Sequence, residues 1–149
     1  MNMISKIDHI NISVSDLEKS KEFYINLLGF KLETEGDLEG DWMDRTVGLE
    51  NVKAKYAKLI IPNSETSLEL IQYYSPSGER DSKISQANQI GFRHMAFEVN
   101  GIENFYQKLK DAGVEIFSEL QFYKIRKQLC YFLGPDGEIL ELAEYSEDK

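Results

Sequence analysis

The sequence has little cysteine, little positive charge and no long apolar run, and each shortage excludes a class of protein. Its single cysteine, Cys130, cannot form an internal disulfide, so nothing in the chain requires an oxidising compartment. Seventeen Lys and Arg against twenty-six Asp and Glu give a net charge of −9, which argues against a surface for nucleic acid or anionic membrane. No apolar run approaches the roughly 18 residues of a membrane helix, and the opening residues contain no signal-peptide stretch. We therefore expect a cytoplasmic protein.

The residues that are present are sufficient for a folded domain. Apolar residues make up 42% of the 149 positions, and eight Phe with eight Tyr can fill a sizeable core. This length fits one ordinary domain, and we expect a single domain over residues 1–149.

The chain repeats itself, and residues 7–32 match residues 92–116. Each segment opens with an alternating run that predicts a half-buried strand, over 9–14 in one and 94–99 in the other. The capping patterns Ser15-x-x-Glu18 and Asn100-x-x-Glu103 then predict helices that end near a glycine. Further strands are expected to begin around positions 30 and 114.

The second halves of the two units also match. Residues 67–73 are SLELIQY and residues 139–145 are ILELAEY, each after another strand-like run, at 55–61 and 127–133. The predicted unit is a strand, a helix and three strands, twice over: module 1 at about 5–74, a linker at about 75–90 and module 2 at about 91–146. The longer first unit carries its extra residues at 36–50, with a short helix expected around 41–47.

The only two histidines, His9 and His94, share one register of the repeat, and Glu69 and Glu141 share another inside LEL triplets. Alternation places each glutamate on the opposite face from its flanking leucines, and a buried carboxylate needs a cation or a donor. If the units pack as pseudo-symmetric halves, these side chains form a set of two nitrogens and two oxygens. Such a set suits Ni, Co, Mn, Fe or Zn better than Ca or Mg, and it leaves open positions for a substrate.

Four segments carry a resemblance to a known family: residues 7–30, residues 67–73 (SLELIQY), residues 91–116 and residues 131–145 (YFLGPDGEILELAEY). They resemble the vicinal oxygen chelate superfamily, which includes glyoxalase I, methylmalonyl-CoA epimerase, extradiol dioxygenases, and fosfomycin and bleomycin resistance proteins. The resemblance implies an α+β fold in which two tandem βαβββ modules form a cupped mixed sheet around a metal site. It also implies that His9, Glu69, His94 and Glu141 bind one divalent metal ion (Ni, Co, Zn or Mn).

The complete His-Glu-His-Glu set resembles glyoxalase I more than the three-ligand dioxygenases or fosfomycin-resistance enzymes. Two positions depart from close relatives: Ser13 stands where bacterial glyoxalase I usually has a glutathione-binding arginine, and Glu69 where the epimerase typically has glutamine. The resemblance implies a lyase or isomerase that moves a proton alpha to a carbonyl through a metal-stabilised enediolate, with Glu141 as the favoured base and Glu69 as the second catalytic residue. An epimerase-like isomerase and a metal-free small-molecule binding module are the alternatives.

Several other residues have two interpretations each. Glu98 could reach the site or be solvated, Tyr73 and Tyr145 could line a pocket or pack, and Trp42 could be a lid or an interface anchor. Three arginines are candidates to bind a carboxylate or phosphate of the substrate: Arg45, Arg93 and Arg126. Cys130 is expected to be a packed core thiol. The expected partners are a small-molecule substrate and a second copy of the chain in a homodimer.

Overall fold

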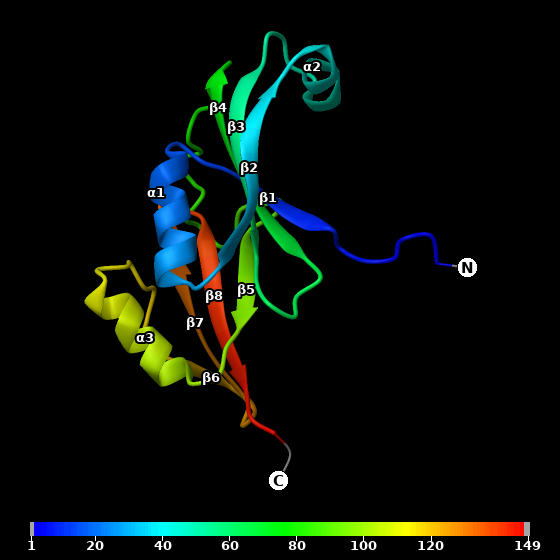
Figure 1. The fold of residues 1–149 in the computed structure, drawn as a ribbon. Helices are drawn as coiled ribbons and strands as arrows, with labels where there is room; N and C mark the ends of the chain where they lie inside the picture. The colour runs from blue at the N-terminus through cyan, green and yellow to red at the C-terminus, as the bar shows by residue number, and fades with distance from the viewer. Residues whose placement is uncertain (1, 148–149) are drawn as a thin grey trace. The chain divides into compact units, whose positions relative to one another are not determined.

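The computed structural model describes residues 2–147, which form two compact units (Figure 1). The first unit reaches Glu79 and the second begins at Arg80, a boundary that lies within the predicted 75–90 linker. Residues 76–93 contain no helix or strand. Among the described residues, no helix is both long and apolar enough to cross a membrane.

The first unit contains a mixed four-stranded sheet in the order β1-β4-β3-β2. Strand β1 is parallel to β4, and the other neighbours are antiparallel. Its elements are β1 (His9–Ser13), α1 (Leu17–Glu22), one wider π-helical turn η1 (Phe23–Leu27), β2 (Lys31–Glu39), α2 (Asp41–Val47), β3 (Lys53–Ile60) and β4 (Ser67–Ser75).

The second unit repeats this topology with the order β5-β8-β7-β6, in which β5 is parallel to β8. Its elements are β5 (His94–Glu98), α3 (Ile102–Asp111), β6 (Gln121–Tyr123), β7 (Lys127–Leu133) and β8 (Ile139–Tyr145). The predicted α+β fold of two βαβββ modules is confirmed, as is the predicted short helix, which is α2.

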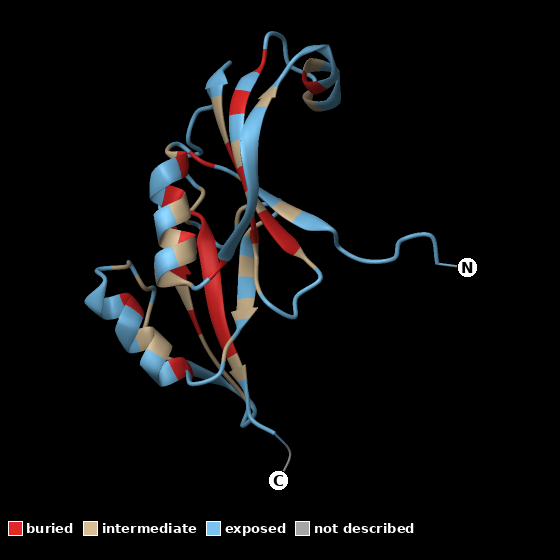
Figure 2. Ribbon diagram, in the orientation of Figure 1, coloured by how far each residue is buried: buried red, intermediate tan, exposed pale blue. Residues whose placement is uncertain are grey.

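The LEL triplets place leucines and glutamates on opposite faces of the two inner strands. Leu68 and Leu70 are buried in the first unit, and Leu140 and Leu142 are buried in the second. Figure 2 shows β8 buried over most of its length, whereas β2 is almost entirely exposed. The alternation therefore directs both glutamates to the face opposite these core leucines.

The helix starts differ from the predicted capping patterns. Asp16, not Ser15, caps α1, and its side chain accepts a hydrogen bond from the Lys19 backbone N–H at 3.1 Å. Helix α3 has Gly101 at the cap position, with φ of +81°, so the Asn100 prediction is wrong.

The last strand of each unit supplies the acceptor that the helix start needs. Gln72 Oε1 accepts a hydrogen bond from the Leu17 backbone N–H at 2.8 Å in the first unit. Glu144, at the matching position of β8, accepts from the backbone N–H groups of Gly101 and Ile102 in the second. The strand contact thus adds to the local Asp16 cap at α1 and takes the place of a local side-chain cap at α3.

The strand expected to begin near position 114 is also absent. Ile116 forms only an isolated bridge with Phe132, and the edge strand of this sheet is β6, further along the chain. Backbone bonds from Phe117 to Tyr131 (2.9 Å) and from Leu133 to Glu115 (2.9 Å) hold the segment beside β7 without extending the ladder.

Candidate metal site

Strands β5 and β8 bring His94 and Glu141 together in the second unit. The parallel register places Glu141 beside Ala96, two residues along from His94 on the same face. His94 Nε2 lies 3.1 Å from Glu141 Oε2, and the Glu141 side chain is only 4% exposed. Tyr131, opposite Glu141 on β7, packs against the imidazole with its ring centre 4.9 Å away. The histidine is therefore held on two sides.

Lys127 holds the other oxygen of the same carboxylate. Its Nζ lies 2.9 Å from Glu141 Oε1, and this contact raises the pKa of the lysine above its ordinary value. Since Lys127 faces Tyr145 across the strand pair, its side chain runs along the sheet to reach Glu141. Glu141 is thus buried with a cation on one oxygen and an imidazole on the other.

The first unit forms a looser version of this pair. His9 Nε2 lies 3.9 Å from Glu69 Oε1, and the Glu69 side chain is 27% exposed. Asn11 Nδ2 donates to the Glu69 backbone oxygen (3.3 Å) and to its Oε1 (3.4 Å). On the other side of the ring, His9 Nδ1 bonds Asp8 Oδ2 at 2.8 Å, which lowers the pKa of that exposed carboxyl.

The surroundings of the two carboxylates differ because the first unit has no counterpart of Lys127 at the same position of the repeat. The strand register places Ala54 in the first unit where Lys127 stands in the second. Lys58 lies opposite Glu69 on β3, but its Nζ bonds Glu33 Oε2 at 2.7 Å, and this raises the Lys58 pKa. Glu69 therefore has an amide donor where Glu141 has an ammonium group.

Both pairs have the nitrogen and oxygen donors that a divalent transition metal takes. Donors bound at about 2.0–2.2 Å lie roughly 3.0 Å apart in neighbouring octahedral positions and roughly 3.4 Å apart in a tetrahedral site. The His94–Glu141 separation of 3.1 Å matches this spacing, and His9–Glu69 at 3.9 Å is somewhat wider. A histidine ligand commonly donates its second ring N–H to a carboxylate, as His9 can to Asp8. Among residues 2–147, no group of three or more His, Cys, Asp or Glu side chains is arranged around a metal position.

The remaining predicted residues lie in varied surroundings. Glu98 is exposed at the end of β5, and Trp42 is 58% exposed on α2. Tyr73 packs against the small core under α2, which contains Met43, Val52, Ala54 and Ile71. Cys130 is buried, as expected, and burial raises its pKa to about 11.

The three candidate arginines also lie in different surroundings. Arg45 pairs with Asp41 on the surface of α2, and Arg93 donates to the Ile84 backbone oxygen at 2.7 Å. Arg126 lines a pocket with Tyr145 at the end of the second sheet. These contacts of Arg45 and Arg93 are made with residues outside the two His–Glu pairs.

Sequence reasoning missed Asn11, Lys127 and Tyr131 as neighbours of the candidate ligands. Asn11 shares the face of His9 by simple alternation, so this signal was present in the sequence. Lys127 and Tyr131 depend on how β7 is registered against β8, which the pattern of a single strand does not specify.

The fold agrees with the comparisons with known proteins. A family model described as Glyoxalase/Bleomycin resistance protein/Dioxygenase superfamily matches residues 6–142. The uncharacterized protein YwkD of Bacillus subtilis is 30% identical over 142 residues, covering 95% of this chain and 98% of YwkD. A glyoxalase family protein from Bacillus cereus has a crystal structure that is 27% identical with a TM-score of 0.90, covering 98% of this chain and 97% of that one.

A relative named for an activity is Glyoxalase I of Saccharomyces cerevisiae, which is 26% identical over 149 residues. The match covers 95% of this chain but 45% of the yeast protein, so the chain spans about half of that relative. The family model, in contrast, covers nearly all of the chain. The chain belongs to the Glyoxalase/Bleomycin resistance protein/Dioxygenase superfamily.

Proposed function

We propose that the chain is a metal-dependent enzyme of the glyoxalase I type, which moves a proton alpha to a carbonyl of a small molecule. The observation that carries this proposal is the pairing of His94 with the buried Glu141, repeated more loosely as His9–Glu69 in the first unit. These four residues are the proposed metal ligands, and the similarity to yeast Glyoxalase I supports the reaction type.

The chain's own residues have distinct roles in this proposal. Asp8 orients the His9 ring so that Nε2 is directed to Glu69, while Tyr131 and Glu141 orient His94. A bound divalent ion would polarise the oxygens of a chelating substrate and acidify the neighbouring C–H. Glu69, which is contacted by the Asn11 amide at 3.4 Å and lies 3.9 Å from His9, can then accept and return the proton.

Metal content tests the ligand assignment. Protein purified without chelator or affinity metal should contain about one divalent ion per chain. His9→Ala and His94→Ala should each lower metal affinity at least about 10-fold. Removing a residue that only supports a metal ligand already has an effect of about this size, and removing a ligand should have no smaller one. The matched control is Glu98→Ala, which removes an exposed acidic side chain from the strand that carries His94. This variant should bind metal normally.

A metal-free binding module is the competing function, and it would show no metal after reconstitution with Ni, Co, Mn or Zn. The reaction itself is tested by following hemithioacetal isomerisation and, separately, deuterium uptake from solvent alpha to a thioester. Oxygen consumption with catechols and no activity in the other two assays would contradict the proposed reaction. The proposed homodimer is checked by light scattering on the same samples.

A further inference from the structure

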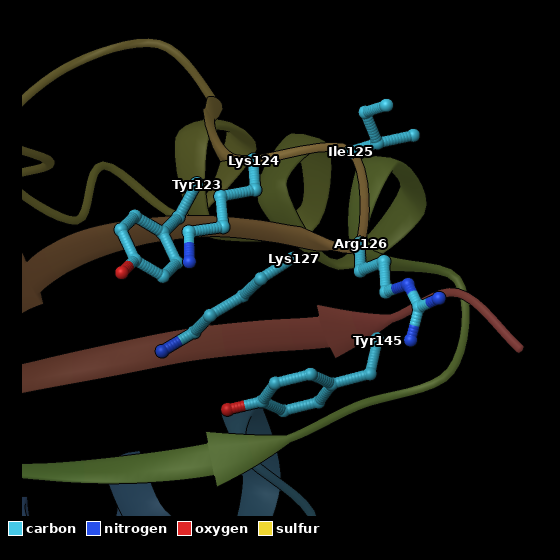
Figure 3. A pocket seen from close by; sticks show the side chains of 6 residues that line it. All are labelled: Tyr123, Lys124, Ile125, Arg126, Lys127 and Tyr145. Atoms are coloured by element: carbon cyan, nitrogen blue, oxygen red, sulfur yellow. The ribbon is translucent and has the colours of Figure 1, made fainter.

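Three cationic side chains surround a pocket of about 490 Å³ where the β6–β7 turn meets the end of β8 (Figure 3). The pocket is lined by Tyr123, Lys124, Ile125, Arg126, Lys127 and Tyr145. These six residues carry three positive formal charges and no carboxylate, on a chain whose net charge is −9. Such a concentration of cations on an acidic protein favours a negatively charged ligand.

The walls of the pocket are held together by the chain beyond β8. The Ser146 backbone N–H donates to the Arg126 backbone oxygen at 2.9 Å, and the Ser146 hydroxyl donates to the Ile125 oxygen at 3.4 Å. Lys124 has φ of +55°, a left-handed conformation that is unfavourable for residues other than glycine. The turn therefore holds a lysine where a glycine would be less strained.

Both lysines of the pocket lie over aromatic rings. Lys124 Nζ is 5.4 Å from the centre of the Tyr123 ring, and Lys127 Nζ is 5.5 Å from that of Tyr145. In Figure 3 the side chains of Lys127 and Tyr145 extend alongside each other in the same direction. The two tyrosine rings and Ile125 give the pocket apolar walls. An inorganic ion would not cover these walls, whereas an organic ligand with an apolar or aromatic part would.

Lys127 connects this pocket to the candidate metal ligand. The same Nζ that lies over Tyr145 is 2.9 Å from Glu141 Oε1. A molecule held by Lys124 and Arg126 would therefore extend toward Glu141 along the face of the sheet that Lys127 and Tyr145 share.

We infer that this pocket binds the anionic end of the substrate, a carboxylate or a phosphate carried on an apolar or aromatic body. That the bound anion is the substrate rests on the proposed function. Binding itself involves only residues of the second unit and does not require a metal. The substrate class is thus an organic anion with its reacting carbonyl at the end remote from the charge.

Ligand binding to the full chain, followed by the backbone amide signals in nuclear magnetic resonance, tests this inference directly. Benzoate, phenyl phosphate and neutral benzamide are titrated at constant ionic strength, first without metal and then with Zn²⁺. We expect at least one anion to shift the signals of residues 123–127, and benzamide to leave them unchanged. The two anions distinguish a carboxylate site from a phosphate site.

The double variant Lys124→Gln with Arg126→Gln should weaken anion binding at least about 10-fold, as expected when charge-assisted hydrogen bonds are lost. The matched control is Lys108→Gln with Lys110→Gln, which removes the same charge from two lysines that also lie over rings in this unit. Control binding should equal that of the wild type.

Equal binding of benzamide, equal loss in the control variant, or no shift with either anion would overturn the inference. A protein that takes up no divalent metal on reconstitution, yet still binds the anion at this pocket, would contradict the proposed function alone. A metal-loaded, active protein whose KM is unchanged in the Lys124/Arg126 variant would contradict this inference alone.

Discussion

Lys127 Nζ lies 2.9 Å from Glu141 Oε1, whereas the repeat places Ala54 at the equivalent position beside Glu69. The two carboxylates hold the same position in the sequence repeat, but this difference gives them different surroundings. Glu141 is buried between a lysine and a histidine, and Glu69 is more exposed and is contacted by an amide. The predictions on the site follow from this asymmetry.

Replacing Lys127 by methionine keeps most of the side chain's length but leaves Glu141 buried without its cation. Losing one partner of a largely buried pair should lower the free energy of unfolding by about 2 kcal/mol, less than the roughly 3–5 kcal/mol of a fully buried pair because Lys127 is partly exposed. Urea denaturation measures the loss.

A bound divalent metal should reduce this loss, because it supplies positive charge to the same carboxylate. Lys58→Met, which breaks the more exposed pair with Glu33, is the control and should lower the free energy of unfolding by less than Lys127→Met does. Equal losses for the two variants would show that Lys127 has no special part in holding Glu141.

Exchanging each glutamate for glutamine separates ligand from base. The sequence alone favours Glu141 as the base, but its contacts restrain both oxygens, and we now expect Glu69 to move the proton. Glu69→Gln should therefore lower kcat roughly 100-fold or more with metal still bound. Glu141→Gln should mainly weaken metal binding.

Steady-state kinetics combined with metal stoichiometry on both variants measures the two effects separately. Normal turnover by metal-loaded Glu69→Gln would return the role of base to Glu141. A loss of metal in both variants, with no change in kcat for the fraction that keeps it, would remove both from that role.

Much of the fold was predictable because it depends on local alternation. The motifs SLELIQY and ILELAEY place leucines on one face of a strand and glutamates on the other, wherever the strand lies. Both predicted strands are present. The start of α3 was not predictable in this way, since its acceptor, Glu144, is distant from Gly101 in the sequence.

The candidate site was predictable only in part, for a related reason. The matched registers of His9 and His94 identified the pairs, because parallel neighbours bring residues of one face together. The reach of Lys127 to Glu141 depends on the β7–β8 register and on a long side chain lying flat along the sheet, and neither is specified by a strand's own pattern.

The contact between Glu144 and the start of α3 should stabilise the second unit. Glu144→Ala removes an acceptor from two backbone N–H groups and should cost about 1 kcal/mol, as removal of a helix cap does. Glu144→Gln should retain most of that stability, because Gln72 fills this role with a neutral amide in the first unit. Urea denaturation and amide hydrogen exchange in α3 check both expectations, and equal effects of the two substitutions would contradict them.

The ionisation of Cys130 should make stability depend on alkaline pH. Burial raises the pKa of this thiol to about 11 in the folded chain, from an ordinary value of 9.0. The unfolded chain therefore loses the proton first as pH rises, and the folded form is disfavoured by linkage. The contribution is fully present below about pH 9 and is lost as pH rises toward about 11.

Comparing wild type with Cys130→Ala isolates this effect, because alanine does not ionise and the other titrating groups are shared. The stability advantage of the wild type, measured by urea denaturation, should shrink between about pH 8 and about pH 10.5. At about pH 8 the native thiol should also react with iodoacetamide much more slowly than the thiol of the urea-unfolded chain, since the reactive species is the thiolate. A stability difference that is constant with pH, together with equal labelling rates in native and unfolded protein, would show that the folded chain leaves the ionisation of Cys130 unaltered.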